Sequence, residues 1–165
     1  MKTNLFDKYH FEIYEDKQMS ISSEKKLCDI IENNMSIFIA DAFNEEYVSH
    51  TREYSFRNQE SFKIKSNQKM IKKRHRIDFF VETKSGTNYA IEVKNYKGNY
   101  NLPSAIGQLL GYGSLFKEEK IEVNLVLVIN NIDLITPAVI ADYNLPIDVV
   151  LVREEALYVM EKKNG

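Results

Sequence analysis

Apolar side chains recur along this chain with two periods, one typical of helices and the other of strands. Within residues 22–43 the apolar spacing is three and four, which predicts one amphipathic helix with Ser22 or Ser23 as its N-cap. The apolar positions of this helix are Leu27, Ile31, Met35, Phe38 and Ala42. Three later segments are rich in strand-forming residues, and a turn at 84–87 makes the last two a hairpin. These strands are predicted at 46–57, 76–83 and 88–95.

The second half of the chain repeats the alternation of helix and strand. Residues 103–117 predict a helix that begins at Pro103, and the continuous apolar run 123–130 predicts a central strand. A short helix at 137–143 and a strand at 147–152 complete the pattern. This order predicts an α/β fold: a central mixed sheet flanked by helices, with an extra C-terminal α/β element.

Composition supports one globular domain. The chain has 165 residues, 44% hydrophobic and 28% charged, so we expect a single domain over 1–165 with residues 1–20 as an N-terminal extension. The one cysteine, Cys28, cannot form an intrachain disulfide, which favours a reducing compartment. No run of about 18 apolar residues exists and the N-terminus is too polar for a secretory signal. We therefore expect an intracellular, cytoplasmic protein without membrane contact.

Positive charge is concentrated in one segment of an acidic chain. Residues 63–76, here called the basic segment, hold seven Lys or Arg and no acid, within a predicted loop or arm at 58–76. With −2 for the whole chain and +7 for this segment, the rest carries −9. Such a block favours contact with a polyanion, although a solvated loop is the alternative. The expected nucleic-acid contacts are Lys63, Lys65, Lys69, Lys72, Lys73, Arg74 and Arg76.

Three charged residues stand inside apolar strands. Glu92 and Lys94 share a face of the strand 88–95 because side chains alternate, and Asp78 in the preceding strand can lie across from them. Buried charges are costly unless they are paired or bound to a metal, and two adjacent carboxylates favour a cation between them. The alternative for this group is a solvent-facing strand with an ordinary cross-strand ion pair.

The short pattern of an acid, any residue and a lysine carries little information alone. It occurs six times, beginning at Glu15, Glu24, Glu82, Glu92, Glu118 and Glu161. Most copies lie in polar surroundings that indicate solvated pairs. Only the copy at Glu92 lies inside an apolar strand that follows an aspartate-bearing strand by one hairpin, so its context makes it a candidate site.

Two predicted helices add further polar candidates. Glu24 projects near the centre of the apolar stripe of the first helix, so its carboxylate can reach the polar site, although a first-turn acid also suits the helix dipole. Gln108 and Tyr112 are four residues apart and share one face of the helix 103–117. That face either supports Lys94 or a phosphate, or is a packed, partly polar surface.

Together these motifs resemble the PD-(D/E)XK nuclease superfamily. The resemblance rests on Ile77-Asp78, Glu92-Val93-Lys94, Gln108-x-x-x-Tyr112 and Ser23-Glu24-x-x-Leu27, with Ile77 where the family name has proline. It spans roughly residues 22–152 in the family's order of elements, and implies a restriction-endonuclease-like αβββαβ core.

The resemblance also implies a site chemistry. Asp78, Glu92 and the backbone carbonyl of Val93 would bind Mg²⁺ or Mn²⁺, and Glu24 would contact the same ion through water or hold a second one. Lys94 would orient the attacking water or stabilise the charge of the transition state. The catalytic set is Glu24, Asp78, Glu92, Lys94 and Gln108, and Tyr112 joins the nucleic-acid contacts.

The expected function is therefore a metal-dependent nuclease that hydrolyses DNA and leaves a 5′-phosphate. The alternatives are a junction-resolving or RNA-directed nuclease, or a nucleic-acid-binding module of the same fold without activity. Small resolvase-like members are dimeric, so a homodimer suits this length. The sequence has no nucleophile elbow, which leaves a Ser or Cys hydrolase with little support. It also has no P-loop and no zinc-ligand spacing.

Overall fold

The computed structural model describes residues 6–8, 23–56, 75–95, 101–130 and 135–152, which form four helices and six strands. The helices are α1 (Glu24–Asn33), α2 (Met35–Phe43), α3 (Asn101–Glu118) and α4 (Ile135–Asp142). The strands are β1 (Phe6–Lys8), β2 (Tyr47–Ser55), β3 (Arg76–Thr83), β4 (Asn88–Lys94), β5 (Asn124–Ile129) and β6 (Ile147–Val152). None of these helices is long and apolar enough to cross a membrane.

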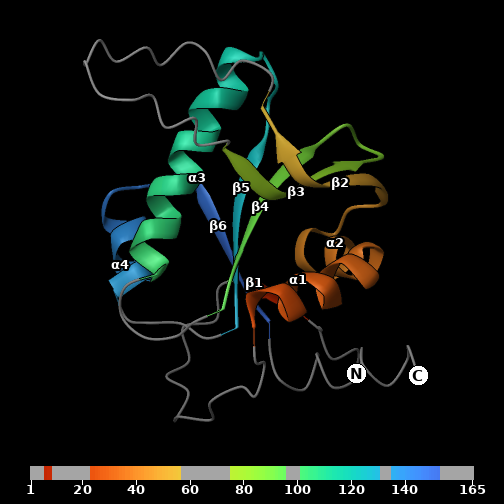
Figure 1. Cartoon of the computed structure of the whole chain (residues 1–165), viewed down its shortest axis with the longest axis horizontal. Helices are drawn as coiled ribbons and strands as arrows, with labels where there is room; N and C mark the ends of the chain where they lie inside the picture. The colour runs from red at the N-terminus through yellow and green to blue at the C-terminus, as the bar shows by residue number, and fades with distance from the viewer. Residues whose placement is uncertain (1–5, 9–22, 57–74, 96–100, 131–134, 153–165) are drawn as a thin grey trace, which may run out of the picture.

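One mixed sheet organises the molecule. Its strand order is β1-β6-β5-β4-β3-β2. β4, β5 and β6 run parallel, whereas β2, β3 and β4 are joined antiparallel and β1 pairs antiparallel with β6. Helices α3 and α4 lie on one side of the sheet, and α1 and α2 lie on the other (Figure 1). The predicted α/β architecture with a central mixed sheet is confirmed.

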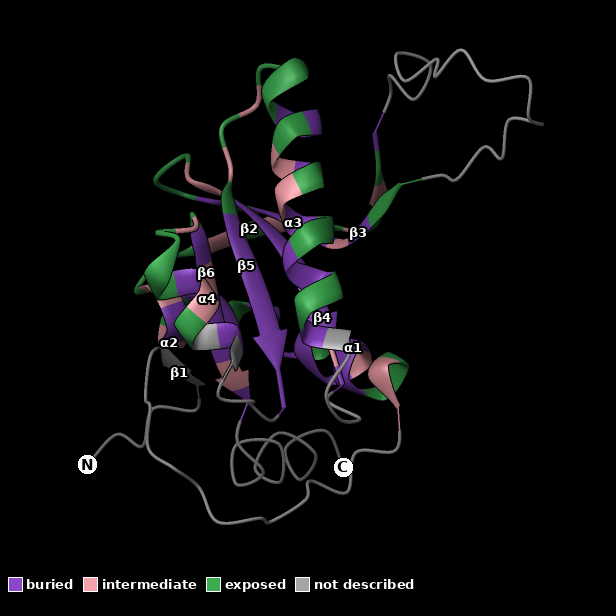
Figure 2. Ribbon diagram, turned by 90° about the vertical axis from the view of Figure 1, so that its left-hand side faces the viewer, coloured by how far each residue is buried: buried purple, intermediate pink, exposed green. Residues whose placement is uncertain are grey.

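Side-chain alternation along the strands divides the interior into two cores. Phe79, Ile91 and Val126 point into the core under α1 and α2. Ala90 and Leu127 point into the core under α3 and α4. β5 is buried along almost its whole length (Figure 2), as expected for a central strand covered on both faces.

The prediction of one continuous helix over 22–43 is wrong, because the helix breaks at Asn34. The Asn34 side chain donates to the Ile30 carbonyl at 2.9 Å, and its backbone N–H bonds back to the end of α1. This local bonding competes with helix propagation and ends α1, after which α2 starts in a new direction. Phe38 and Ile39 of α2 are then fully buried. At the other end the predicted Ser23 cap is present, and its hydroxyl accepts from the Lys26 N–H at 3.1 Å.

The N-terminal extension contributes a strand that the sequence pattern did not predict. β1 pairs with β6, with Phe6 opposite Val152 and Lys8 opposite Val150. A segment of three residues is too short for its alternation to be recognised in the sequence. β1 is therefore identified only by its pairing with the edge of β6.

Two glycines of α3 predict opposite responses to the same substitution. Gly111→Ala is expected to raise the free energy of unfolding by about 0.5–1 kcal/mol, since alanine is the better helix former. A Cβ there meets no atom within 4 Å. At Gly113 a Cβ would lie 3.0 Å from Leu125 Cδ1, so Gly113→Ala is expected to gain less or to lose stability. Urea unfolding measures both, and equal gains would contradict this packing.

Candidate active site

β3 and β4 separate beyond the last pair of their shared ladder, and Asp78 lies at the point of separation. That last pair is Phe79 with Ile91. Beyond it the Val93 N–H donates to Asp78 Oδ2 at 2.7 Å. A side-chain carboxylate therefore takes the place of a strand carbonyl, which holds Asp78 against β4.

A local change in the twist of β2 accompanies this separation. Arg52 pairs with Phe79 and lies over its ring, 5.9 Å from the centroid, on the side of α1. Tyr54, only two residues later, packs in the opposite core beside Phe116. Glu53 between them has φ of 50°, the left-handed region, which reverses the normal alternation. The paired segment of β3 turns with it, at Asp78.

Glu92 and Lys94 lie at the carboxyl end of β4 and form an ion pair. Lys94 Nζ is 2.8 Å from Glu92 Oε1 and 3.6 Å from Glu24 Oε1, so one ammonium joins β4 to the start of α1. The Glu92 side chain is only 5% exposed. Its second oxygen, Oε2, is buried and has no hydrogen-bond partner among the described residues. An unsatisfied buried carboxylate oxygen is costly and marks a place for a missing partner.

Burial and mutual repulsion change the protonation of this group. Burial raises the pKa of Glu92 to about 7, and the charge of Asp78 adds to the rise. Burial also raises the pKa of Asp78, against the effect of the Val93 hydrogen bond. For Lys94 burial acts to lower the pKa, but the charge and hydrogen bond of Glu92 outweigh it and raise the pKa. Lys94 is therefore charged at neutral pH, whereas Glu92 titrates there.

The predicted metal ligands are gathered only in part. In the described residues no three His, Cys, Asp or Glu side chains are arranged to hold a metal ion. Besides burial, the charge of Asp78 raises the pKa of Glu92, and the charge of Glu24 adds to the rise for both groups, while Glu24 itself pairs with Lys94. In the described residues, Asp78 and Glu92 thus lie together, but the Lys94 ammonium lies between Glu92 and Glu24, so the three predicted acids are not assembled around one metal position.

The two predicted residues of α3 have different surroundings. Gln108 is exposed, and no polar contact of its side chain is found in the described part of the chain. Tyr112 is buried and stacks on Phe56 with the ring centroids 5.8 Å apart. Burial raises the pKa of Tyr112 to about 12, and the charges of Glu92 and Asp78 contribute. Tyr112 therefore lies near the carboxylates and stays protonated.

Most of the basic segment lies outside the described residues. This applies to Lys63, Lys65, Lys69, Lys72, Lys73 and Arg74. Arg76 is described, is exposed, and lies 3.4 Å from Glu53 Oε2. Because β3 begins at Arg76, the basic segment enters the sheet two residues before Asp78. The described end of this segment, Arg76, is therefore close to Asp78 in the sequence.

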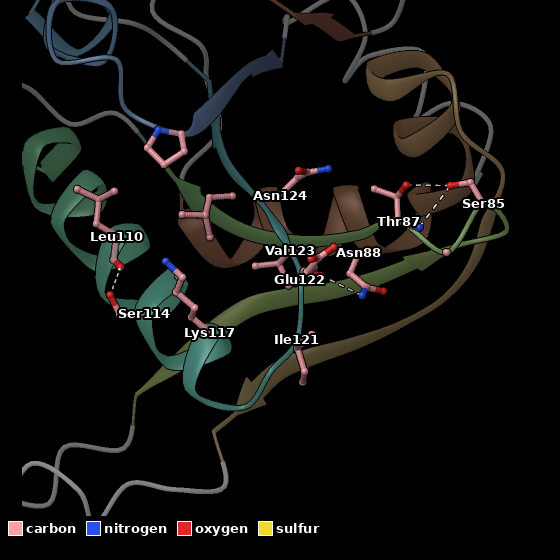
Figure 3. Close-up of a pocket in the computed structure, with 14 residues that line it drawn as sticks. Ser85, Thr87, Asn88, Leu110, Ser114, Lys117, Ile121, Glu122, Val123 and Asn124 are labelled. Carbon is pink, nitrogen blue, oxygen red and sulfur yellow. Dashed lines mark hydrogen bonds between the residues drawn. The ribbon is translucent and has the colours of Figure 1, made fainter.

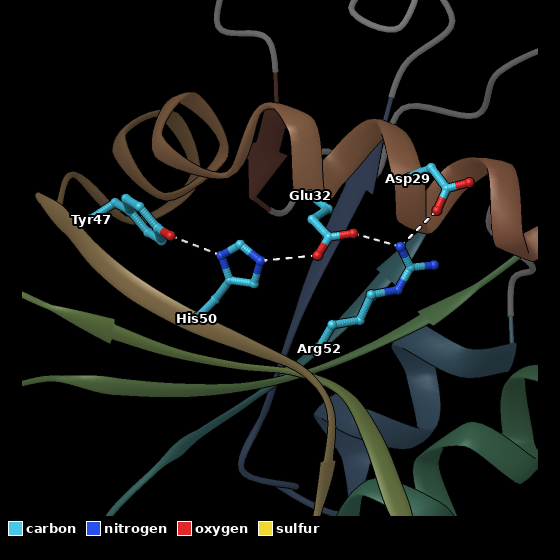
Figure 4. Close-up of polar contacts among 5 residues, drawn as sticks. All are labelled: Asp29, Glu32, Tyr47, His50 and Arg52. Carbon is cyan, nitrogen blue, oxygen red and sulfur yellow. Dashed lines mark hydrogen bonds and ion pairs between the residues drawn. The ribbon is translucent and has the colours of Figure 1, made fainter.

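Sequence reasoning missed a polar network between α1 and β2 (Figure 4). Its members are Asp29, Glu32, Tyr47, His50 and Arg52. Two signals were available in the sequence. Asp29 and Glu32 are three residues apart and share a face of α1, and His50 and Arg52 are two residues apart and point to the same side of β2. Neither shows that the two elements meet.

A separate hollow lies at the other end of β4 (Figure 3). Its volume is about 730 Å³, and it is lined by the β3–β4 turn, the C-terminal half of α3 and the segment before β5. Asn88, the first residue of β4, lies in its wall and donates to the Glu122 carbonyl at 3.1 Å. Glu92 and Lys94 are at the opposite end of that strand, so this hollow is distinct from the candidate site.

Comparison with known proteins supports the fold. No protein-family model matches the sequence, and no curated protein sequence matches it. The structure is similar to that of a repair endonuclease from Pyrococcus abyssi, with a TM-score of 0.52 and 17% sequence identity. The match covers 87% of this chain and 50% of that one, so the chain spans about half the length of its neighbour. At this identity the likeness shows the restriction-endonuclease-like fold, which confirms the predicted fold class.

Proposed function

We propose that this protein is a metal-dependent nuclease that hydrolyses DNA phosphodiester bonds at Asp78, Glu92 and Lys94. The observation that carries the proposal is the buried Glu92 Oε2, which has no hydrogen-bond partner in the described part of the chain although Asp78 and a charged lysine lie beside it. A carboxylate with a pKa raised to about 7 by burial and a like charge is typical of a functional site.

The donor set fits a hard divalent cation. Mg²⁺ prefers carboxylate and carbonyl oxygens, which Asp78, Glu92 and the Val93 backbone supply. A cation would offset the repulsion between the two carboxylates and satisfy the Glu92 oxygen that has no partner among the described residues. Glu24 would join through water or help to hold a second ion. Bound there, Mg²⁺ or Mn²⁺ would lower the pKa of a water molecule and neutralise phosphate charge.

The other residues would orient and stabilise the reacting groups. The Lys94 ammonium, held by Glu92 and Glu24, donates to the attacking water or to a phosphate oxygen that gains charge in the transition state. The water oxygen bonds to phosphorus, the bond to the 3′ oxygen breaks, and that oxygen takes a proton. The products are a 5′-phosphate and a 3′-hydroxyl. The protonated Tyr112 and the exposed Gln108 would contact the phosphate or support Lys94.

The basic segment is proposed to contact the DNA backbone. Replacing Lys72, Lys73, Arg74 and Arg76 by glutamine is expected to weaken binding. If all four contact phosphates, the slope of log Kd against log salt concentration should fall by about 3.6, since each phosphate contact contributes about 0.9. Binding of duplex DNA between 50 and 200 mM salt measures it. Replacing the exposed Lys25 and Lys26 of α1 is the control. An unchanged slope would make the segment an ordinary charged loop.

A substrate panel tests the proposed function. Linear duplex, single strand, circle, flap and four-way junction are incubated with the protein in Mg²⁺ or Mn²⁺, with RNA and metal-free reactions beside them. Metal-dependent cleavage of DNA with 5′-phosphate ends supports the proposal. Preference for the junction or for RNA would select an alternative nuclease, and metal binding without cleavage of any substrate would indicate a binding module of this fold.

A further inference from the structure

Helix α1, which begins at Glu24, is tied to β2 by one arginine. Arg52 Nη1 lies 2.7 Å from Asp29 Oδ1 and 2.5 Å from Glu32 Oε2 (Figure 4). Asp29 and Glu32 are three residues apart, so they lie on the same side of the helix on successive turns. A single guanidinium nitrogen therefore bridges two turns of α1 to a strand of the sheet.

The bridge is anchored at both ends. On the sheet side, the Arg52 guanidinium lies over the ring of Phe79, which is fully buried. On the helix side, the other Glu32 oxygen contacts His50 Nε2 at 3.2 Å, and His50 Nδ1 contacts the Tyr47 hydroxyl at 2.8 Å. Burial acts to raise the pKa of Glu32, yet the hydrogen bonds from His50 and Arg52 lower it overall. Glu32 is therefore held as a charged acceptor.

The Arg52 bridge gives α1 directional contacts, which its apolar contacts do not provide. Leu27 and Ile31 of α1 are fully buried, but apolar burial is non-directional and tolerates rotation or sliding of a helix. Charge-assisted hydrogen bonds have a preferred geometry. At a rise of about 1.5 Å per residue, Asp29 and Glu32 lie about 8 and 12 Å along the axis from Glu24. A small rotation of α1 about its apolar contacts would displace Glu24 from Lys94.

We propose that Arg52 is a positioning residue, which by bridging Asp29 and Glu32 fixes the orientation of α1 that holds Glu24 against Lys94. Its importance for catalysis rests on the proposed function, whereas its effect on the Glu24–Lys94 contact does not. Arg52 acts through α1 and needs no contact with the substrate.

Cross-linking tests the geometry without any measurement of activity. A carbodiimide joins a contacting carboxylate and amine as an amide and leaves as its urea, so it links Glu24 to Lys94 at their 3.6 Å separation. Peptide mass spectrometry quantifies the link. Arg52→Met keeps an unbranched side chain over Phe79 and is expected to lower the yield about fivefold or more, since the directional contacts are lost. Arg52→Lys is expected to restore part of it.

Two controls separate positioning from general loosening and from the charge of Arg52. The Lys84–Glu46 pair, 2.9 Å apart, involves the β3–β4 turn and no residue of α1, and it should cross-link equally in all variants. The double variant Asp29→Asn/Glu32→Gln keeps Arg52 but removes its charged acceptors, and should lower the Glu24–Lys94 yield as Arg52→Met does. An unchanged Glu24–Lys94 yield in either folded variant, or an equal fall for both links, would overturn the proposal. If Arg52→Met does not fold, the double variant decides.

Cleavage kinetics give a second test. Arg52→Met is expected to lower kcat about tenfold with little change in KM, because displacement of a catalytic group by about 1 Å can cost up to a hundredfold. In a Glu24→Gln background the same change should cost nothing further, since the group that Arg52 positions is already inactive. Additive losses would contradict the positioning role. If the wild type cleaves no nucleic acid, the proposed function fails while the cross-link still decides this inference.

Discussion

Glu92→Gln is expected to lower the rate of metal-dependent DNA cleavage by about 10³-fold or more, equivalent to about 4 kcal/mol of transition-state stabilisation. Glutamine keeps the shape of the buried side chain but removes the charge that would hold the cation beside Asp78. The measurement is the single-turnover rate of cleavage of the best substrate in the panel, at saturating Mg²⁺. Asp78→Asn is expected to show a loss of the same size.

The matched control is Glu82→Gln. Glu82 begins another copy of the acid-x-Lys pattern, but its side chain is exposed. Its carboxylate accepts a hydrogen bond from the Ser49 hydroxyl at 2.7 Å. This variant should cleave within about twofold of wild type, since surface substitutions rarely matter. Circular dichroism verifies that all variants are folded. Wild-type rates in both Glu92→Gln and Asp78→Asn would show that the proposed site is wrong.

Without metal, the protein is expected to lose stability as the pH rises from about 4.5 to 7. Burial raises the pKa of Glu92 from 4.5 to about 7 in the folded protein, so across this window the folded state binds a proton that the unfolded state has released. The stabilisation that proton binding to Glu92 provides is complete at pH values below the pKa of Glu92 in the unfolded chain. It is lost as the pH rises through the pKa of Glu92 in the folded protein. The loss is on the order of 3 kcal/mol. The raised pKa of Asp78 acts in the same direction.

Urea unfolding in EDTA at pH 5 and pH 8 measures this dependence. Glu92→Gln should have a smaller pH dependence and greater stability than wild type at pH 8, although it is inactive. Added Mg²⁺ should stabilise the wild type more at pH 8 than at pH 5, because ligands must be deprotonated to bind. Identical pH dependence in wild type and Glu92→Gln would show that Glu92 is not held in an unfavourable site.

The sequence predicted the class of fold and the proximity of three residues of the candidate site for the same reason: both depend on local order along the chain. Helical and strand periods are visible within about ten residues, so the alternation of elements could be recognised. Asp78, Glu92 and Lys94 lie on two strands of one hairpin, where pairing and side-chain alternation bring nearby residues together.

Long-range geometry was less accessible. β1 adds to β6 across almost the whole chain, and the Arg52 bridge joins β2 to α1 by contacts that neither element reveals alone. The break at Asn34 depends on a side chain that competes with its own helix, and the apolar spacing of residues 22–43 continues through it. Apolar periodicity indicates which face of a helix is buried, but it does not indicate where the helix axis changes direction.

By itself, the sequence determined the alternation of helical and strand segments from residue 22 onward, the mixed α/β sheet, and the positions at which charge interrupts an apolar strand. Only the tertiary structure decided that Asp78 accepts the Val93 N–H where β3 leaves β4 and that Lys94 joins Glu92 to Glu24. It also decided that one Glu92 oxygen is buried with no partner among the residues that the structure describes. The physical reason is that a residue's type sets which bonds its side chain can make. The burial and charge of neighbours from other elements set which of those bonds are made and which are left open.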